Sequence, residues 1–195
     1  DLRFYDTAAP IKEWEHRDRR GGGLTHDIYD MAIDSNGSIF SVGRAGTGWW
    51  IKKIYPNGTE AWNITAGGSC SGINDEAYSV AINSNDDIFV VGDGCDSNPG
   101  TGSGMWVKKF YQDGTEDLSW NHKFYGVVGG VAYSVAIDNN DAVYVVGSAA
   151  NVVHAYSYAD WRIRKFYSNG TEDLSWNLTF DGNNGYDRAY SIEFD

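Results

Sequence analysis

The amino-acid sequence predicts an all-β protein and, within that class, a β-propeller built of four-stranded antiparallel blades. Two observations carry this prediction. The segment WVKKFYQDGTEDLSWNHKF at positions 106–124 returns as RIRKFYSNGTEDLSWNLTF at positions 162–180, so the chain contains an internal repeat. The composition, with 24 Gly, 3 Pro and 15% aromatic residues, is typical of short strands joined by turns.

The first strand of each repeat is expected in a stretch similar to AYSVAID. It occurs as IYDMAID (28–34), AYSVAIN (77–83), AYSVAID (132–138) and AYSIEFD (189–195), and the shared Tyr recurs after 49, 55 and 57 residues. Regular alternation would turn Ala77, Ser79 and Ala81 to one face of the sheet and the residues between them to the other. Glu193 replaces an Ala here and is expected to face solvent, whereas the role of Asp30, which replaces a Ser, is left open.

The second strand follows a polar turn, and the third and fourth strands form a hairpin. The second strand is SIFSVG, DIFVVG or AVYVVG, and the third is WIKKIY, WVKKFY or RIRKFY. The turns PNGT, QDGT and SNGT come next, and their Asn-Gly or Asp-Gly pairs favour a tight hairpin. The fourth strand carries Trp62, Trp120 or Trp176. Lysines of the third strand, Lys108 and Lys109, are expected to lay their stems along aromatic rings and to send their ammonium groups to water.

A unit of roughly 50 residues with four short antiparallel strands is typical of a propeller blade. We therefore expect one domain, 1–195, with a partial blade at 1–25, repeats at approximately 26–74, 75–130 and 131–186, and a partial blade at 187–195. The ends supply first, third and fourth strands but no second strand, so the chain holds about 3.6 repeats. Three interpretations stay open: a fragment of a longer propeller, a closed four-blade ring with one defective blade, or a subunit whose ends complete one another between molecules.

The combination of AYSVAID, DIFVVG and WVKKFYQDGTEDLSW resembles the bacterial and archaeal β-propeller repeats of the SBBP type. The resemblance covers essentially the whole chain. It implies an extracellular or cell-surface scaffold, and it brings no catalytic residues with it.

The charge and hydropathy of the chain exclude several partners. With a formal net charge of -12, the chain lacks the basic surplus that nucleic acid or an anionic membrane surface requires. No apolar run approaches the length of a transmembrane helix. The partners expected instead are copies of the same chain, other surface proteins or a glycan.

The sequence offers modification sites that suit an oxidising, extracellular location. We predict a disulfide between Cys70 and Cys95, because the loops that carry them should emerge at the same end of a blade. Five sequons are candidate glycosylation sites: Asn63, Asn177, Asn57, Asn169 and Asn36. The first two follow the repeated Trp and are the more informative, because hairpin turns favour Asn-Gly at Asn57 and Asn169 in any case.

No catalytic motif or cofactor is expected. The acidic and amide residues of the turns after the first strands bear some similarity to calcium loops, but Asx turns explain them better than Ca²⁺ does. The four histidines have no metal-ligand spacing, and neither a G-x-S-x-G elbow nor a phosphate loop is present. The apolar loop with Val152, Val153, Tyr156 and Tyr158 is a possible contact patch, or it packs over its own blade.

These observations favour a structural or interaction protein that assembles with itself into a ring or a filament, or that forms part of a larger surface protein. The alternative is a carbohydrate- or ligand-binding propeller, similar to a lectin, that uses its loop face. A lyase or lactonase type of enzyme is the third hypothesis, and we expect the chain not to be an enzyme.

Overall fold

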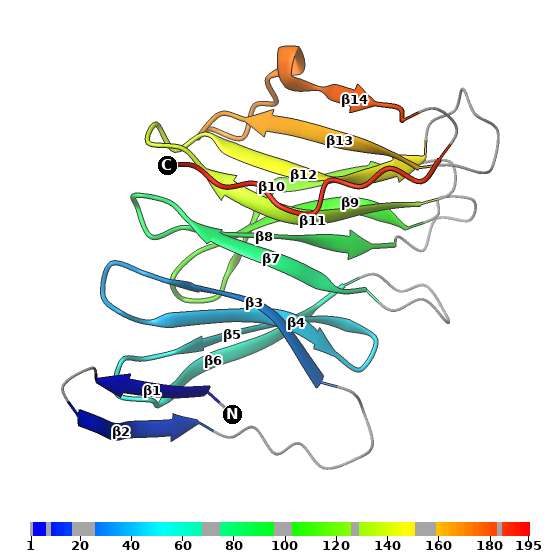
Figure 1. Ribbon diagram of the computed structural model, residues 1–195. Coiled ribbons are helices and arrows are strands. Elements are labelled where there is room, and N and C mark those ends of the chain that lie inside the picture. The colour runs from blue at the N-terminus through cyan, green and yellow to red at the C-terminus, as the bar shows by residue number, and fades with distance from the viewer. Residues whose placement is uncertain are drawn as a thin grey trace.

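The computed structural model contains three four-stranded antiparallel sheets that stack face to face (Figure 1). It describes residues 2–6, 9–16, 26–67, 75–95, 103–125, 129–150, 159–182 and 185–195, with the backbone only for residues 2–6, 9–16 and 125. Sheet I comprises β3 (His26–Ile33), β4 (Ile39–Ala45), β5 (Gly48–Ile54) and β6 (Glu60–Ala66). Sheet II comprises β7 (Ala77–Ile82), β8 (Ile88–Gly94), β9 (Gly104–Phe110) and β10 (Glu116–Tyr125). Sheet III comprises β11 (Gly130–Ile137), β12 (Val143–Ala150), β13 (Ala159–Phe166) and β14 (Leu178–Phe180).

Strands that are consecutive in the sequence are neighbours in every sheet, so each repeat forms one meander. This confirms the all-β class and the four strands per repeat. A separate hairpin, β1 (Leu2–Asp6) and β2 (Ala9–His16), lies at the opposite end of the stack from sheet III (Figure 1). No sheet in the described part of the chain closes on itself, and the propeller arrangement stays a proposal.

The hairpin turns between third and fourth strands have the predicted chemistry. Gly58, Gly114 and Gly170 take φ values of 82°, 88° and 86°, which glycine adopts without steric cost. In the first of these turns the Tyr55 N–H donates to the Thr59 carbonyl at 2.9 Å, and the Gly58 N–H donates to the Tyr55 carbonyl at 2.8 Å. These bonds fix the register of β5 against β6.

The regular alternation expected for the first strands is wrong, because each first strand contains a β-bulge. The pairing shifts between Ile28 and Asp30, between Ala77 and Ser79, and between Ala132 and Ser134, so the shared Tyr is the extra residue each time. A bulge turns the following side chains to the other face. Ala77 and Val80 therefore lie on the same side, in the core between sheets I and II.

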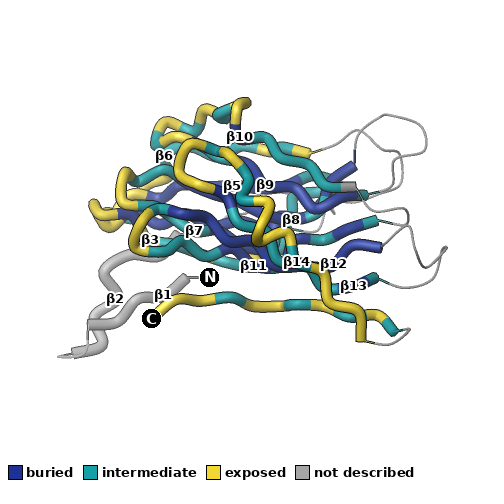
Figure 2. The backbone as a smooth tube through the Cα atoms, turned by 90° about the horizontal axis from the view of Figure 1, so that it is seen from above, coloured by how far each residue is buried: buried dark blue, intermediate teal, exposed yellow. Residues whose placement is uncertain are grey.

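Two hydrophobic cores hold the stack together. The first lies between sheets I and II and includes Phe40, Trp49, Ile51, Val90 and Trp106. The second lies between sheets II and III and includes Phe89, Met105, Trp120, Val145 and Phe166. Both faces of the central strands are consequently buried, as Figure 2 shows for the dark blue segments. This burial explains why the second strands carry apolar residues on both faces through most of their length.

The lysines of the third strands contact aromatic rings as expected, but the prediction that their ammonium groups reach water is wrong. Lys108 Nζ lies 5.3 Å from the Trp106 ring centroid. The residue is only 6% exposed, and its Nζ pairs with Glu116 at 3.0 Å. Lys52 with Glu60 and Arg164 with Glu172 repeat this pair in the other sheets. The fourth strand supplies the carboxylate that compensates the buried charge in sheets I and II, and in sheet III the carboxylate of Glu172 precedes η1.

Sheet III departs from the repeat at its fourth strand. Trp176 lies in a short 3₁₀ helix, η1 (Leu174–Trp176), and β14 is only three residues long, so the fourth strand predicted at Trp176 is wrong. The segment from Ala189 to Asp195 takes the place of a further first strand beside β11 (Figure 1). It belongs to no sheet and is largely exposed (Figure 2).

Candidate functional site

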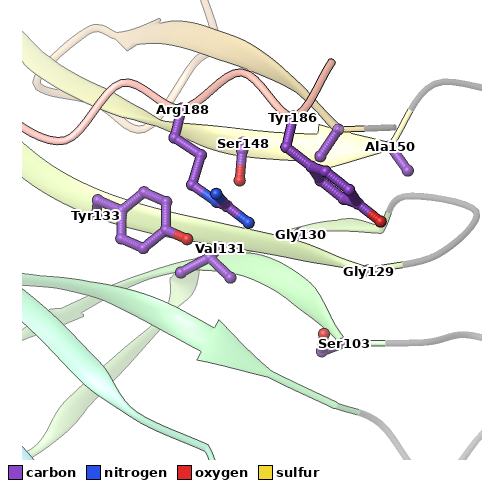
Figure 3. Close-up of a pocket in the computed structure, with 10 residues that line it drawn as sticks. Ser103, Gly129, Gly130, Val131, Tyr133, Ser148, Ala150, Tyr186 and Arg188 are labelled. Carbon is purple, nitrogen blue, oxygen red and sulfur yellow. The ribbon is translucent and has the colours of Figure 1, made fainter. Parts of the chain in front are cut away.

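The candidate site is a pocket between sheets II and III and the segment that follows β14. Its walls are the start of β11, with Gly129, Gly130 and Val131, and the end of β12, with Ser148 and Ala150. Tyr133, Tyr186 and Arg188 also line it, and Ser103 lies across the pocket from Arg188 (Figure 3). The cavity volume is about 170 Å³. This volume suits a small ligand rather than a polymer.

Arg188 supplies the charge of the pocket. Its guanidinium carbon lies 5.4 Å from the Tyr186 ring centroid. Electrostatic interaction with Tyr133 and a hydrogen bond to Tyr190 raise the pKa of Arg188, so it is a permanent cation. A cation beside tyrosine rings and hydroxyl groups suits a ligand with a flat face and a carboxylate. The sequence did not indicate Tyr133, Tyr186 and Arg188 as site residues, because Tyr133 lies more than 50 positions before the other two and only the fold brings them together.

The tyrosines of the pocket belong to a ladder that runs across the repeats. The rings of Tyr29 and Tyr78, of Tyr78 and Tyr133, and of Tyr133 and Tyr190 lie 5.4, 5.6 and 5.0 Å apart between centroids. Each of the first three is the bulged residue of its strand, and the bulge turns it out of the sandwich core. The ladder therefore lines one edge of the stack.

The other end of the ladder carries a different set of charges. Glu76 accepts hydrogen bonds from the hydroxyl groups of Tyr29 at 3.1 Å and Tyr78 at 2.8 Å. Arg44 joins Glu76 at 2.5 Å and Asp27 at 2.8 Å. Glu76 and Arg188 occupy the same position in their repeats, just before the shared Ala-Tyr pair, so the charge of this position is reversed between the two ends.

Asp30, for which the sequence suggested no role, connects neighbouring sheets. Its Oδ2 accepts hydrogen bonds from the Ser79 hydroxyl at 2.8 Å and from the Val80 N–H at 3.0 Å. The Ser79 hydroxyl oxygen accepts from the Val135 N–H at 3.4 Å, and that of Ser134 accepts from the Ile192 N–H at 3.3 Å. Each first strand is thus fastened to the next by one side-chain oxygen. Glu193 is exposed, as expected.

The turns between first and second strands are Asx turns, as predicted. Oδ1 of Asp34 accepts the N–H groups of Asn36 and Ser38, and Asn83 and Asp138 make the equivalent bonds in the other repeats. A second acid of the turn in sheets II and III links it to the turn of the preceding sheet. The Asp86 carboxylate accepts hydrogen bonds from the Ser35 N–H and hydroxyl at 2.9 and 2.5 Å, and the Asp141 carboxylate accepts those of Ser84 at 2.9 and 2.6 Å.

The candidate glycosylation sites differ in exposure. Asn36, Asn57, Asn169 and Asn177 are exposed, whereas Asn63 is half-buried and its amide nitrogen donates to Glu60. Asn57 and Asn169 accept the N–H of Thr59 and Thr171, each at 3.0 Å, as turn residues do. Occupancy of every sequon stays a prediction.

Two of the predicted features fall wholly or partly outside the described residues. The loop with Val152, Val153, Tyr156 and Tyr158 is one, and Cys70 is the other. The Cys95 N–H donates to Asp75 Oδ1 at 3.2 Å, so the loop after β8 meets the segment before β7 at this end of the sheets. The disulfide stays a prediction.

Comparisons with known proteins add little. No family model and no curated protein matches this chain. One solved structure, a protein of unknown function from Bacteroides caccae, is similar with 12% sequence identity and a TM-score of 0.36 over 91% of this chain and 89% of that one. A likeness this weak carries no argument. Among the described residues no helix is long and apolar enough to cross a membrane.

Proposed function

We propose that this chain is an extracellular or cell-surface β-propeller repeat protein with a structural role, and that its blades stack head to tail on copies of the same chain. The resemblance to SBBP-type repeats supports the propeller and the location. The observation that carries the proposal is the pair of open faces at the two ends of the stack. Each exposes the apolar residues that the internal boundaries bury.

The open face of sheet III is defined by Trp176, Phe180 and the segment Ala189–Asp195. Trp120 packs on Phe89 of its own sheet at 4.8 Å, and a Cβ atom at Gly170 of the next sheet would lie 3.1 Å from its ring. Trp176 makes the equivalent contact with Tyr144 at 5.3 Å, but no further sheet of the described strands follows sheet III on this side. The exposure of the side chains is 2% for Trp120 and 39% for Trp176. The sequence EDLSWN is identical around both, so the neighbouring sheet makes the difference.

The open face of sheet I is defined by Ile28, Met31 and Ile33 of β3. Ile28 and Met31 correspond to Ala77 and Val80 of β7. Ala77 and Val80 are 0% and 6% exposed in the core between sheets, whereas Ile28 and Met31 are 47% and 43% exposed. A second copy whose hairpin β1–β2 and sheet I followed sheet III and Ala189–Asp195 of the first copy would bury both faces in the way the chain already buries its internal ones.

In this arrangement one copy supplies the first strand of the joining blade through its segment Ala189–Asp195. The next copy supplies third and fourth strands through β1 and β2. A contact between two different faces generates a ring where the rotation closes and a filament where it does not.

Mixing two variants tests the proposal. We expect the wild-type chain to form oligomers in sedimentation velocity, and Trp176→Asp or Met31→Asp each to be monomeric, because a charge in an apolar boundary is costly. An equimolar mixture of the two variants retains one intact pair of faces and is expected to form dimers and nothing longer. The control is Leu174→Ala, since Leu174 is 72% exposed and its internal counterpart Leu118 is 75% exposed. A monomeric wild-type chain, or a mixture without dimers, refutes the proposal.

The pocket favours a second candidate function, the binding of a small carbohydrate. Arg188, Tyr133 and Tyr186 provide a cation and two aromatic surfaces around about 170 Å³. A monosaccharide with a carboxylate, such as a uronic acid, fits this chemistry. Binding to an array of acidic glycans would favour this function over a purely structural one.

A further inference from the structure

We infer that Asp160, Asp181 and Asp187 form a binding site for one calcium ion, which fastens the segment after β14 to the start of β13. This site lies beyond the stacking role proposed above and does not depend on it. One oxygen from each of the three carboxyl groups lies within 4.8 Å of the others. Oxygens on opposite sides of one Ca²⁺ are separated by about 4.6–5.2 Å, because Ca–O distances are about 2.3–2.6 Å.

Asp160 points to a ligand independently of its acidic neighbours. The residue is only 2% exposed, and its Oδ2 atom has no hydrogen-bond partner. A buried carboxylate oxygen without a partner is costly unless a cation or a donor satisfies it. Arg162, two residues along the same strand, interacts electrostatically with Asp160 but donates no hydrogen bond to its Oδ2 atom.

The backbone holds Asp187 in place for this role. Its N–H donates to the Ala159 carbonyl at 2.7 Å, which brings it next to Asp160. Its Oδ2 accepts the Gly182 N–H at 2.6 Å. A Cβ atom at Gly182 would lie 2.5 Å from Oδ1 of Asp187, so only glycine permits this approach. The carboxylate is thereby held beside both β13 and the end of β14.

The equivalent position in sheet I has one carboxylate where sheet III has three. There the Asp75 N–H donates to the Thr47 carbonyl at 3.0 Å, as the Asp187 N–H does to Ala159. Gly48 occupies the position of Asp160, and Gly67 that of Asp181. A single carboxylate thus faces two glycines in sheet I and two more carboxylates in sheet III. The repeat can therefore form without the two extra carboxylates. The repulsion among the three carboxylates favours a divalent cation between them.

Calcium titration of four proteins tests the inference: wild type, Asp160→Asn, Asp181→Gly and the control Asp113→Asn. The control removes one negative charge at a distant turn where the other repeats carry Asn. After chelator treatment, we expect isothermal titration calorimetry to show one Ca²⁺ per wild-type chain and per control chain. The affinity of both site variants should fall by at least about tenfold. Asp181→Gly restores the residue of sheet I, so it keeps the test decisive if Asp160→Asn fails to fold.

Two further readouts complete the experiment. Calcium at about 100 times its Kd should raise the Tm of the wild type by about 5 °C and leave that of Asp181→Gly unchanged. Amide hydrogen exchange in residues 178–195 should slow with Ca²⁺ in the wild type alone. Equal calcium binding by all four proteins, or no binding by the wild type, overturns the inference. Binding of Mg²⁺ as tight as that of Ca²⁺ overturns the choice of ion.

Discussion

The carboxyl group of Asp93 shows how strongly the fold acts on a single residue. It lies near the end of β8, where its Oδ1 accepts the Glu76 N–H at 2.8 Å. Burial raises the pKa of Asp93 to about 7, with Glu76 and Asp75 adding negative charge nearby, although the hydrogen bond from Glu76 opposes the shift. Burial, the charge of Asp93 and a hydrogen bond to Glu76 raise the pKa of Tyr78. The start of the tyrosine ladder is thus a crowded acidic site.

The free energy of unfolding should depend on pH through Asp93. Its pKa in the unfolded chain is near 3.9, so between about pH 4 and pH 7 the folded protein binds more protons at this site. The stability contribution is therefore full below about pH 4 and is lost as the pH rises to about 7. We expect Asp93→Asn to be more stable than the wild type at pH 8 by about 2 to 4 kcal/mol, and to differ little at pH 4.

Urea denaturation at pH 4 and pH 8 measures this difference. The control is Asp113→Asn, because hydrogen bonds from Thr115 lower the pKa of Asp113 and its effect has the opposite sign. Parallel pH dependence of the wild type and Asp93→Asn would show that Asp93 ionises normally in the folded state.

Residue roles that arise within one strand or turn could be predicted from the sequence, but roles that join two sheets could not. The Asx turns at Asp34, Asn83 and Asp138 follow from local spacing, and the structure confirms them. Asp30 binds Ser79, which lies 49 residues further along the chain. The acid at Asp160 stands out only when repeats are aligned residue by residue, since Gly48 and Gly104 take its place elsewhere.

At the scale of elements, each turn between a first and a second strand in sheets II and III is hydrogen-bonded to the corresponding turn of the preceding sheet. Asp141 of sheet III binds Ser84 of sheet II, and Asp86 of sheet II binds Ser35 of sheet I. Both acids have positive φ, 59° for Asp141 and 61° for Asp86, and Gly37 takes the equivalent position in sheet I. The contact outweighs the backbone strain at these two positions.

Substitution of Asp141 separates the contact from the strain. We expect Asp141→Ala to lower the free energy of unfolding by about 1 to 2 kcal/mol, and Asp141→Gly to lower it less, because glycine accepts the positive φ. A double-mutant cycle with Ser84→Ala should give a coupling free energy of at least about 0.5 kcal/mol in urea denaturation. Additive effects of the two alanine substitutions would mean that the turns are independent.

The strands were predictable as elements because their apolar runs and turn residues repeat, whereas the bulges were not. A bulge depends on the pairing of two strands, and the sequence of the first strand alone allows regular alternation. The same holds for EDLSWN, which lies within β10 in sheet II, whereas its Leu-Ser-Trp part forms η1 in sheet III. Identical residues thus take two conformations in the two repeats.

At the scale of the whole molecule, sheet I contacts sheet II through β7, and sheet III contacts sheet II through β11. Sheet II is packed on both faces by the two cores, whereas sheets I and III each have an open face. In such an arrangement local stability decreases from the centre to the ends. The stack of repeats followed from the sequence, but ring closure depends on the angle between sheets, which no local pattern encodes.

Hydrogen exchange should report this gradient. In the monomeric variant Trp176→Asp, we expect amides of β8 and β9 to exchange slowest, those of β4, β5, β12 and β13 faster, and those of β14 fastest. In the oligomer that we propose for the wild type, the outer sheets should gain protection because neighbouring copies would cover their open faces. Equal protection of all three sheets in the monomeric variant would mean that the chain unfolds as one unit.

The tyrosine ladder also gives the molecule an optical signature. Rings whose centroids lie 5.0–5.6 Å apart in a fixed orientation form a chiral array of chromophores. Near-ultraviolet circular dichroism reports such fixed aromatic packing and loses intensity when the packing is lost. In the stacking that we propose, each added copy would place its Tyr29 beside the Tyr190 of another copy and extend the array by four rings. The tyrosine band would then follow polymer growth in solution without any attached label.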